Sequence, residues 1–115
     1  MKIVRFEDVI AWQKAKELCL LLYKEFKDCR DFKFKDQLLS ASVSVMNNIA
    51  EGFDRGGMKE LTRFLVISKG SCGEVKSMLY LARDLGYITE PTFKLAYGAS
   101  VEISKMLVGF IRSIK

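Results

Sequence analysis

The fold of this chain is decided by two stretches, Asn47-Asn48-Ile49-Ala50-Glu51-Gly52-Phe53-Asp54-Arg55 and Ser68-Lys69-Gly70-Ser71-Cys72-Gly73-Glu74. In both, polar residues and glycines interrupt an apolar helical pattern. A glycine inside a helix costs about 1 kcal/mol relative to alanine, so Gly70 and Gly73 need a reason. A phosphate-binding loop would place its glycines before a helix N-terminus, which these two are not. The small residues therefore predict the close approach of a neighbouring helix.

Apolar residues recur at alternating steps of three and four on either side of these stretches, as in the helices of a bundle. A first helix is expected from about Asp8 to Asp28, followed by a charged and aromatic loop over residues 29–35. Its seam is Trp12, Ala15, Cys19, Leu22 and Phe26.

A second helix is expected from about Asp36 to Arg55. Residues 40–45 alternate as in a strand, but the run is short and helical spacing continues through it, at Leu38, Ala41, Val45, Asn48 and Gly52. Gly56 and Gly57 are expected to end the helix, since glycine tolerates the left-handed backbone of a helix stop.

A third helix is expected from about Met58 to Leu85, and Thr89 is expected to cap a fourth. The third seam is Leu61, Leu65, Ser68, Cys72, Val75, Leu79 and Ala82. The fourth is Phe93, Ala96, Ser100, Ile103, Leu107, Phe110 and Ile114, with a second stripe beside it at Tyr97, Val101, Val108 and Ile111. Short loops make consecutive helices antiparallel neighbours. The predicted fold is all-α, an antiparallel up-down-up-down four-helix bundle with a left-handed twist, formed as one domain over residues 1–115.

Composition narrows the class of protein. Half of the 115 residues are hydrophobic, which is high for a small monomer and favours oligomerisation. No apolar run reaches the roughly 18 residues that a membrane span needs, and no secretory signal opens the sequence, so a cytoplasmic protein is expected. The three cysteines are widely separated and histidine is absent, so we expect no metal site and no cofactor.

The net charge is +5, and residues 58–115 contribute +4 of it, with nine basic and five acidic residues. Lys69, Lys76, Tyr80 and Arg83 fall in one row of the third helix. Lysine and arginine suit a phosphate backbone, and tyrosine can stack on a base, so the row is a candidate nucleic-acid surface. The alternative is the solvated face of an amphipathic helix. A second, weaker basic cluster is Arg55, Lys59 and Arg63.

Polar residues near the contact of the second and third helices form a further candidate group: Asn48, Glu51, Ser71 and Glu74. We interpret them as a structural network that fixes the register of the helices. An acid–base pair of Glu51 with Glu74 is the functional alternative. It lacks a histidine, a nucleophile and an evident pocket, so no catalytic residue is assigned.

The chain resembles the 23S rRNA intervening-sequence protein family over nearly its whole length. Two elements are fairly specific as a pair, Asn48-Ile49-Ala50-Glu51-Gly52 and Gly70-Ser71 with Glu74 three residues later. Further matches are Phe6-Glu7-Asp8-Val9, Trp12-Gln13-Lys14-Ala15, Ser44, Arg55, Glu60, Arg63-Phe64-Leu65 and Ala82-Arg83-Asp84-Leu85-Gly86-Tyr87. The family tends to have alanine where Lys69 precedes Gly70.

The resemblance implies a small helical protein that assembles as a ring, typically a homopentamer, with no established enzymatic activity. The family is also similar to the accessory variability protein of diversity-generating retroelements, a basic pentamer that binds nucleic acid and a reverse transcriptase. Two functions therefore stay open. The protein is expected either to bind RNA or DNA as a ring, or to serve as a scaffold for a protein partner.

Overall fold

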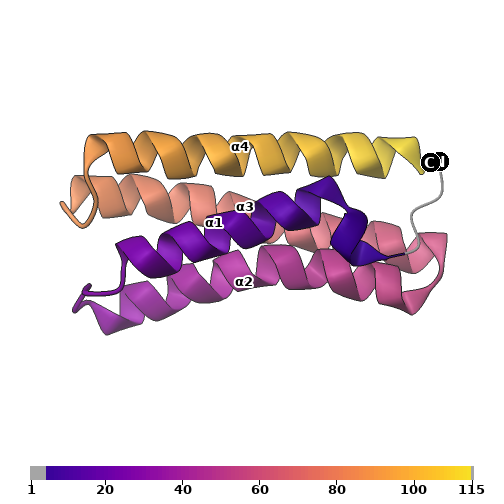
Figure 1. Cartoon of the computed structure of the whole chain (residues 1–115), viewed down its shortest axis with the longest axis horizontal. Coiled ribbons are helices and arrows are strands. Elements are labelled where there is room, and N and C mark those ends of the chain that lie inside the picture. The colour runs from indigo at the N-terminus through magenta and orange to yellow at the C-terminus, as the bar shows by residue number, and fades with distance from the viewer. Residues whose placement is uncertain (1–4, 115) are drawn as a thin grey trace.

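The structure is a computed structural model that describes residues 5–114. A short 3-10 turn, η1 (Phe6–Asp8), precedes four α-helices: α1 (Ile10–Glu25), α2 (Phe32–Arg55), α3 (Met58–Asp84) and α4 (Glu90–Ser113). The helices lie side by side, with the α1–α2 and α3–α4 connections at one end and the α2–α3 turn at the other (Figure 1). The described residues form no strand, so the all-α prediction is confirmed. The handedness of the twist stays a prediction.

The core lies where the three-four spacing places it. The predicted seam of α3 is buried at every position, from Leu61 to Ala82. On α4 the seam is buried from Phe93 to Leu107, whereas Phe110 is half-buried near the end of the helix. The second stripe of α4 is half-buried too, and its Tyr97 ring stacks on Phe93 with ring centres 5.3 Å apart. This stripe therefore packs partly within the chain.

Two helix starts differ from the prediction. α1 begins at Ile10 rather than Asp8, because η1 occupies the residues before it. It ends at Glu25 rather than Asp28, because residues 26–28 form a turn. α2 begins at Phe32 rather than Asp36, so the loop predicted over residues 29–35 is too long. The N-cap of α2 is Asp31, whose carboxylate accepts a hydrogen bond from the backbone N–H of Phe34 at 3.2 Å.

The remaining helix boundaries follow the predicted turn chemistry. Gly56 ends α2 with φ +83°, the left-handed conformation that glycine tolerates. Thr89 caps α4, and its hydroxyl accepts from the backbone N–H of Thr92 at 3.3 Å. Three buried serines bond backbone carbonyls, so no buried side-chain polar atom of the described residues lacks a partner.

Glycine marks one close helix contact, but not the one expected. A methyl group added at Gly52 of α2 would lie 3.0 Å from Cβ of Phe64 and 3.1 Å from Cδ1 of Leu61, both on α3. Added at Gly70 or Gly73, it would meet no atom within 4 Å. Within the described chain, no neighbouring helix makes the close approach that was predicted at Gly70 and Gly73.

Candidate nucleic-acid interface

The basic row of α3 lies along the side of that helix next to α4. Lys69 is exposed and Lys76 is half-buried, two helical turns further on. Tyr80 contacts α4 directly, with its ring centre 5.1 Å from that of Tyr97. A hydrogen bond to Tyr97 and desolvation raise the pKa of Tyr80. The tyrosine is thus partly committed to an aromatic cluster, although 44% of its surface stays exposed.

The Arg83 side chain contacts other side chains of the same chain. Its guanidinium lies 4.5 Å from the centre of the Phe93 ring and 5.3 Å from that of Tyr80. Its Nε also donates to the Asp84 carboxylate at 3.1 Å. The row therefore combines two lysines, for which no ion pair is found among the described residues, with an arginine that also anchors the α3–α4 contact.

The second basic cluster is largely neutralised. Arg55 bonds Glu51 at 2.9 Å, and Arg63 bonds Glu60 at 3.2 Å. The two guanidinium groups also lie over the Phe64 ring, at 5.1 and 4.6 Å from its centre. The Arg63 hydrogen bond lowers the pKa of Glu60. Lys59 is exposed, so it is the member of this cluster best placed to meet a phosphate.

The four residues of the predicted polar network divide into separate contacts. Ser44, which was not predicted as part of it, connects two of them. Its hydroxyl lies 2.8 Å from that of Ser71 and accepts from the Asn48 side-chain amide at 2.9 Å. Glu51 instead pairs with Arg55, and Glu74 accepts a long hydrogen bond from Gln37 at 3.4 Å. The structure therefore joins α2 to α3 through Ser44, and both carboxylates are exposed.

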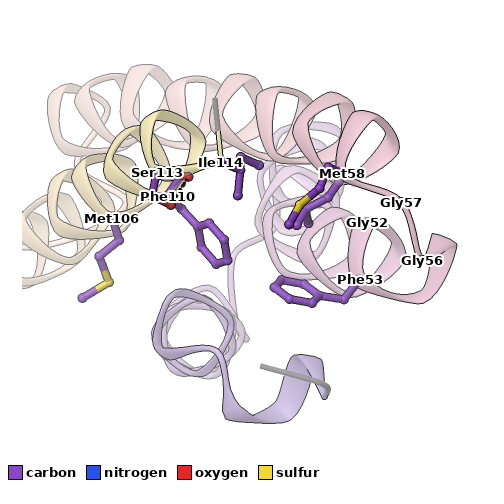
Figure 2. Close-up of a pocket in the computed structure, with 10 residues that line it drawn as sticks. Gly52, Phe53, Gly56, Gly57, Met58, Met106, Phe110, Ser113 and Ile114 are labelled. Atoms are coloured by element: carbon purple, nitrogen blue, oxygen red, sulfur yellow. Dashed lines mark hydrogen bonds between the residues drawn. The ribbon is translucent and has the colours of Figure 1, made fainter. Parts of the chain in front are cut away.

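An apolar pocket of about 760 Å³ lies at the α2–α3 end of the bundle, between the ends of α2 and α4. Phe53 and Phe110 face each other there with ring centres 5.7 Å apart, and Met58, Met106 and Ile114 extend the lining (Figure 2). The sequence did not reveal this pocket, because its residues belong to the apolar rows of different helices. At this end of the bundle α1 begins short of the ends of α2 and α4 (Figure 1).

Two kinds of chemistry find no support in the part of the chain that the structure describes. Residues 5–114 contain no group of three or more His, Cys, Asp or Glu side chains placed to hold a metal ion. Burial raises the pKa of the Cys19 and Cys72 thiols, which disfavours the reactive thiolate. Within these residues, no helix has the length and apolar character needed to cross a membrane.

The bundle and its residues can be compared with known proteins. A crystal structure of a protein of unknown function from the S23 ribosomal protein family of Bacteroides thetaiotaomicron VPI-5482 superposes with a TM-score of 0.83 at 21% identity, covering 90% of this chain and 96% of that one. At this identity the likeness shows the fold. A search of curated proteins finds no match. The 23S rRNA-intervening sequence protein family matches residues 7–109. The chain therefore belongs to the family of 23S rRNA-intervening sequence proteins.

Proposed function

We propose that the protein is a non-enzymatic, cytoplasmic, ring-forming bundle that binds RNA or DNA through the α4 side of α3. The proposal is carried by Lys69 and Lys76, for which no ion pair is found within residues 5–114. Lys59 is a further exposed lysine of α3 and lies near the α2–α3 turn. Residues 58–115 also supply +4 of the net charge of +5. Such a surface attracts phosphate without reading sequence.

The arginines have a smaller part in this interface than the lysines. Arg55, Arg63 and Arg83 are paired with carboxylates, and each lies over an aromatic ring. A phosphate would have to compete with those contacts. We therefore place the first phosphate contacts at Lys69 and Lys76, with Tyr80 beside them for a base to stack on.

The proposed interface is tested by replacing both lysines together, Lys69→Glu with Lys76→Glu. Retention of a labelled single-stranded RNA or DNA at low salt should fall at least about tenfold, because two phosphate contacts become repulsive. The matched control is Lys24→Glu with Lys33→Glu, which changes the net charge equally on α1 and α2. Equal losses in the two variants, or no binding by the unmodified protein at low salt, would refute the interface.

Assembly is the second part of the proposal. Several large apolar side chains are exposed on different helices, among them Leu20, Phe32 and Leu95, at 61–63%. Such surface is normal when scattered but favours association when a chain carries much of it. A heterologous contact that closes on itself covers these surfaces without leaving an open edge. We propose a homopentamer, tested by the mass of the particle in solution.

A protein-binding scaffold is the second candidate function. It is favoured by the pocket between Phe53 and Phe110, because apolar pockets of this size accept apolar side chains. The partner in that case would be a reverse transcriptase or another protein. Binding that persists at high salt and survives the Lys69 and Lys76 replacements would favour the scaffold, since apolar burial is insensitive to counterions.

A further inference from the structure

The side of α3 that faces away from the core carries a second row of uncharged residues, which we call the outer row. Its members are Val66, Gly70, Gly73, Ser77 and Tyr80, again at steps of four and three. Val66 is 53% exposed, Tyr80 is 44% exposed and the adjacent Leu81 is 49% exposed. A helix that is apolar on two sides normally has a neighbour on both. Within the chain, α2 and α4 cover only the inner side of α3.

The glycines of the outer row have no packing role within the chain. A methyl group at Gly70 or Gly73 would meet nothing within 4 Å, so alanine would fit at either position. Each glycine costs the helix about 1 kcal/mol relative to alanine. Small residues in the middle of a helix face let a second helix approach closely. The space at Gly70 and Gly73 therefore suits a helix from outside the chain.

Opposite charges flank the outer row on its two sides. Lys69 precedes Gly70, and Glu74 follows Gly73. Lys69 has no ion pair among the described residues, and within them the Glu74 carboxylate accepts one hydrogen bond, the 3.4 Å contact from Gln37. If Gly70 takes position a of a heptad and Gly73 position d, Lys69 is at g and Glu74 is at e. In a parallel helix pair, a g residue faces the e residue five positions further along the partner.

We propose that the outer row pairs two copies of this chain, with their α3 helices parallel and crossing at Gly70 and Gly73. In that arrangement Lys69 of each copy lies beside Glu74 of the other, which forms two equivalent ion pairs about the two-fold axis. The charges also select the orientation. An antiparallel pair would bring g positions together and place Lys69 next to Lys76 of the other copy.

The ends of the outer row limit the contact to the middle of α3. Arg63 is the next residue in the row toward the N-terminus, and its guanidinium is held by Glu60 and lies over Phe64. Asp84 is the next toward the C-terminus and is paired with Arg83. In a parallel pair these like charges would meet at the same level. We therefore expect the helices to diverge there, with contact confined to residues 66–81.

This pairing goes beyond the proposed function and does not depend on ring closure. A two-fold contact cannot close a ring of five, so it would act between rings where rings form and between two chains where they do not. Lys69 and Tyr80 belong to both proposals, whereas Glu74 lies outside the nucleic-acid surface. Glu74→Lys should therefore weaken pairing while leaving nucleic-acid retention intact or stronger. Failure of one proposal is thus visible separately from failure of the other.

Charge exchange tests the pairing in the full chain. Lys69→Glu and Glu74→Lys should each raise the dissociation constant of pairing by about tenfold or more, because each places like charges together twice. The combined variant exchanges the charges and should restore the constant to within about threefold of the original. Sedimentation equilibrium gives the constants, and circular dichroism checks folding. A wild-type particle that never doubles, unchanged single variants, or a combined variant as weak as the singles would overturn the proposal.

A cysteine placed on the two-fold axis tests the orientation. In a chain carrying Cys29→Ser, which leaves only the two buried cysteines, Gly70→Cys should form a disulfide with the same residue of the second copy on mild oxidation. The control Lys105→Cys, on the exposed side of α4, should stay unlinked at the same concentration. Absence of the link at position 70, or equal linking at both positions, would overturn the parallel two-fold arrangement.

Discussion

At the scale of single residues, glycines that all lie inside helices differ in how closely neighbouring atoms pack against them. Gly52 is buried against Phe64 and Leu61, whereas Gly70, Gly73 and Gly109 have open space where a side chain would begin. The sequence shows each of them as a glycine inside an apolar helix. Which one touches a neighbour depends on the rotation of α2 against α3, and the spacing of residues does not define that rotation.

The close contact at Gly52 leads to a stability prediction. Gly52→Ala should lower the free energy of unfolding by about 1–2 kcal/mol, because overpacking costs more than the helix gains from alanine. Gly109→Ala is the matched control. It should leave stability unchanged or raise it by up to about 1 kcal/mol, since nothing lies within 4 Å of the added methyl. Urea denaturation measures both variants. Equal effects would show that Gly52 is not a packing contact.

Asp31 connects the two loops at one end of the bundle, and its titration can be predicted. The Tyr87 hydroxyl donates to its carboxylate at 2.7 Å, and the Phe34 N–H donates as well. Both bonds favour the charged form and lower the pKa of Asp31 below its ordinary value of 3.8. The resulting stabilisation is fully present above pH 3.8 and is lost as the pH falls through the lower folded-state pKa.

Tyr87→Phe removes the larger of these two influences. The pKa of Asp31 should then rise toward its ordinary value, as followed by NMR titration of its carboxyl carbon. Asp36 is an exposed carboxylate further along α2 and serves as the control, because Tyr87 bonds Asp31 and not Asp36. An Asp31 pKa that does not move in Tyr87→Phe would contradict the bond between the two loops.

At the scale of elements, the helices were largely predictable because burial is periodic. The seam of α3 was foreseen at every position, and glycine and threonine correctly marked the end of α2 and the start of α4. The start of α2 was missed because Asp31 lies among other charged residues, which hides its role as a cap. The sequence predicts where the basic residues lie on the helices, but it does not predict which of their charges are left without a carboxylate partner. Rotamers and the geometry of the α2–α3 turn decide that Glu60 also lies within 3.8 Å of Arg55.

The α2–α3 contact offers a prediction at this scale. The Ser68 hydroxyl is buried and donates to the Val45 carbonyl at 2.6 Å, whereas the Ser71 hydroxyl is half-buried and bonds Ser44. Ser68→Ala should therefore lower the free energy of unfolding by about 1 kcal/mol, the usual net worth of a buried hydrogen bond. Ser71→Ala should cost less, because water can replace its partner. Thermal denaturation that ranks them in reverse would contradict this account of the contact.

At the scale of the whole molecule, the bundle is 43 Å long, and the proposed interface rests on two lysines of α3 that have no ion pair within residues 5–114. Two or three phosphate contacts give weak binding, so the proposed function requires that the contacts be repeated around an assembly. Once the basic row of one subunit holds a nucleic-acid strand, the basic row of the next subunit meets that strand at a high effective concentration. Affinity should therefore depend on the length of the nucleic acid far more than on its sequence.

This dependence can be measured with single-stranded RNAs of one composition and increasing length. An oligonucleotide of about six nucleotides is long enough for one basic row and should bind weakly. One of about thirty nucleotides should bind at least a hundredfold more tightly through avidity. The longer complex should also lose affinity more steeply as salt rises, because more counterions are released. Fluorescence anisotropy reports both quantities. Equal affinity per protein chain at the two lengths would mean that each basic row binds independently, and a ring would then add nothing to binding.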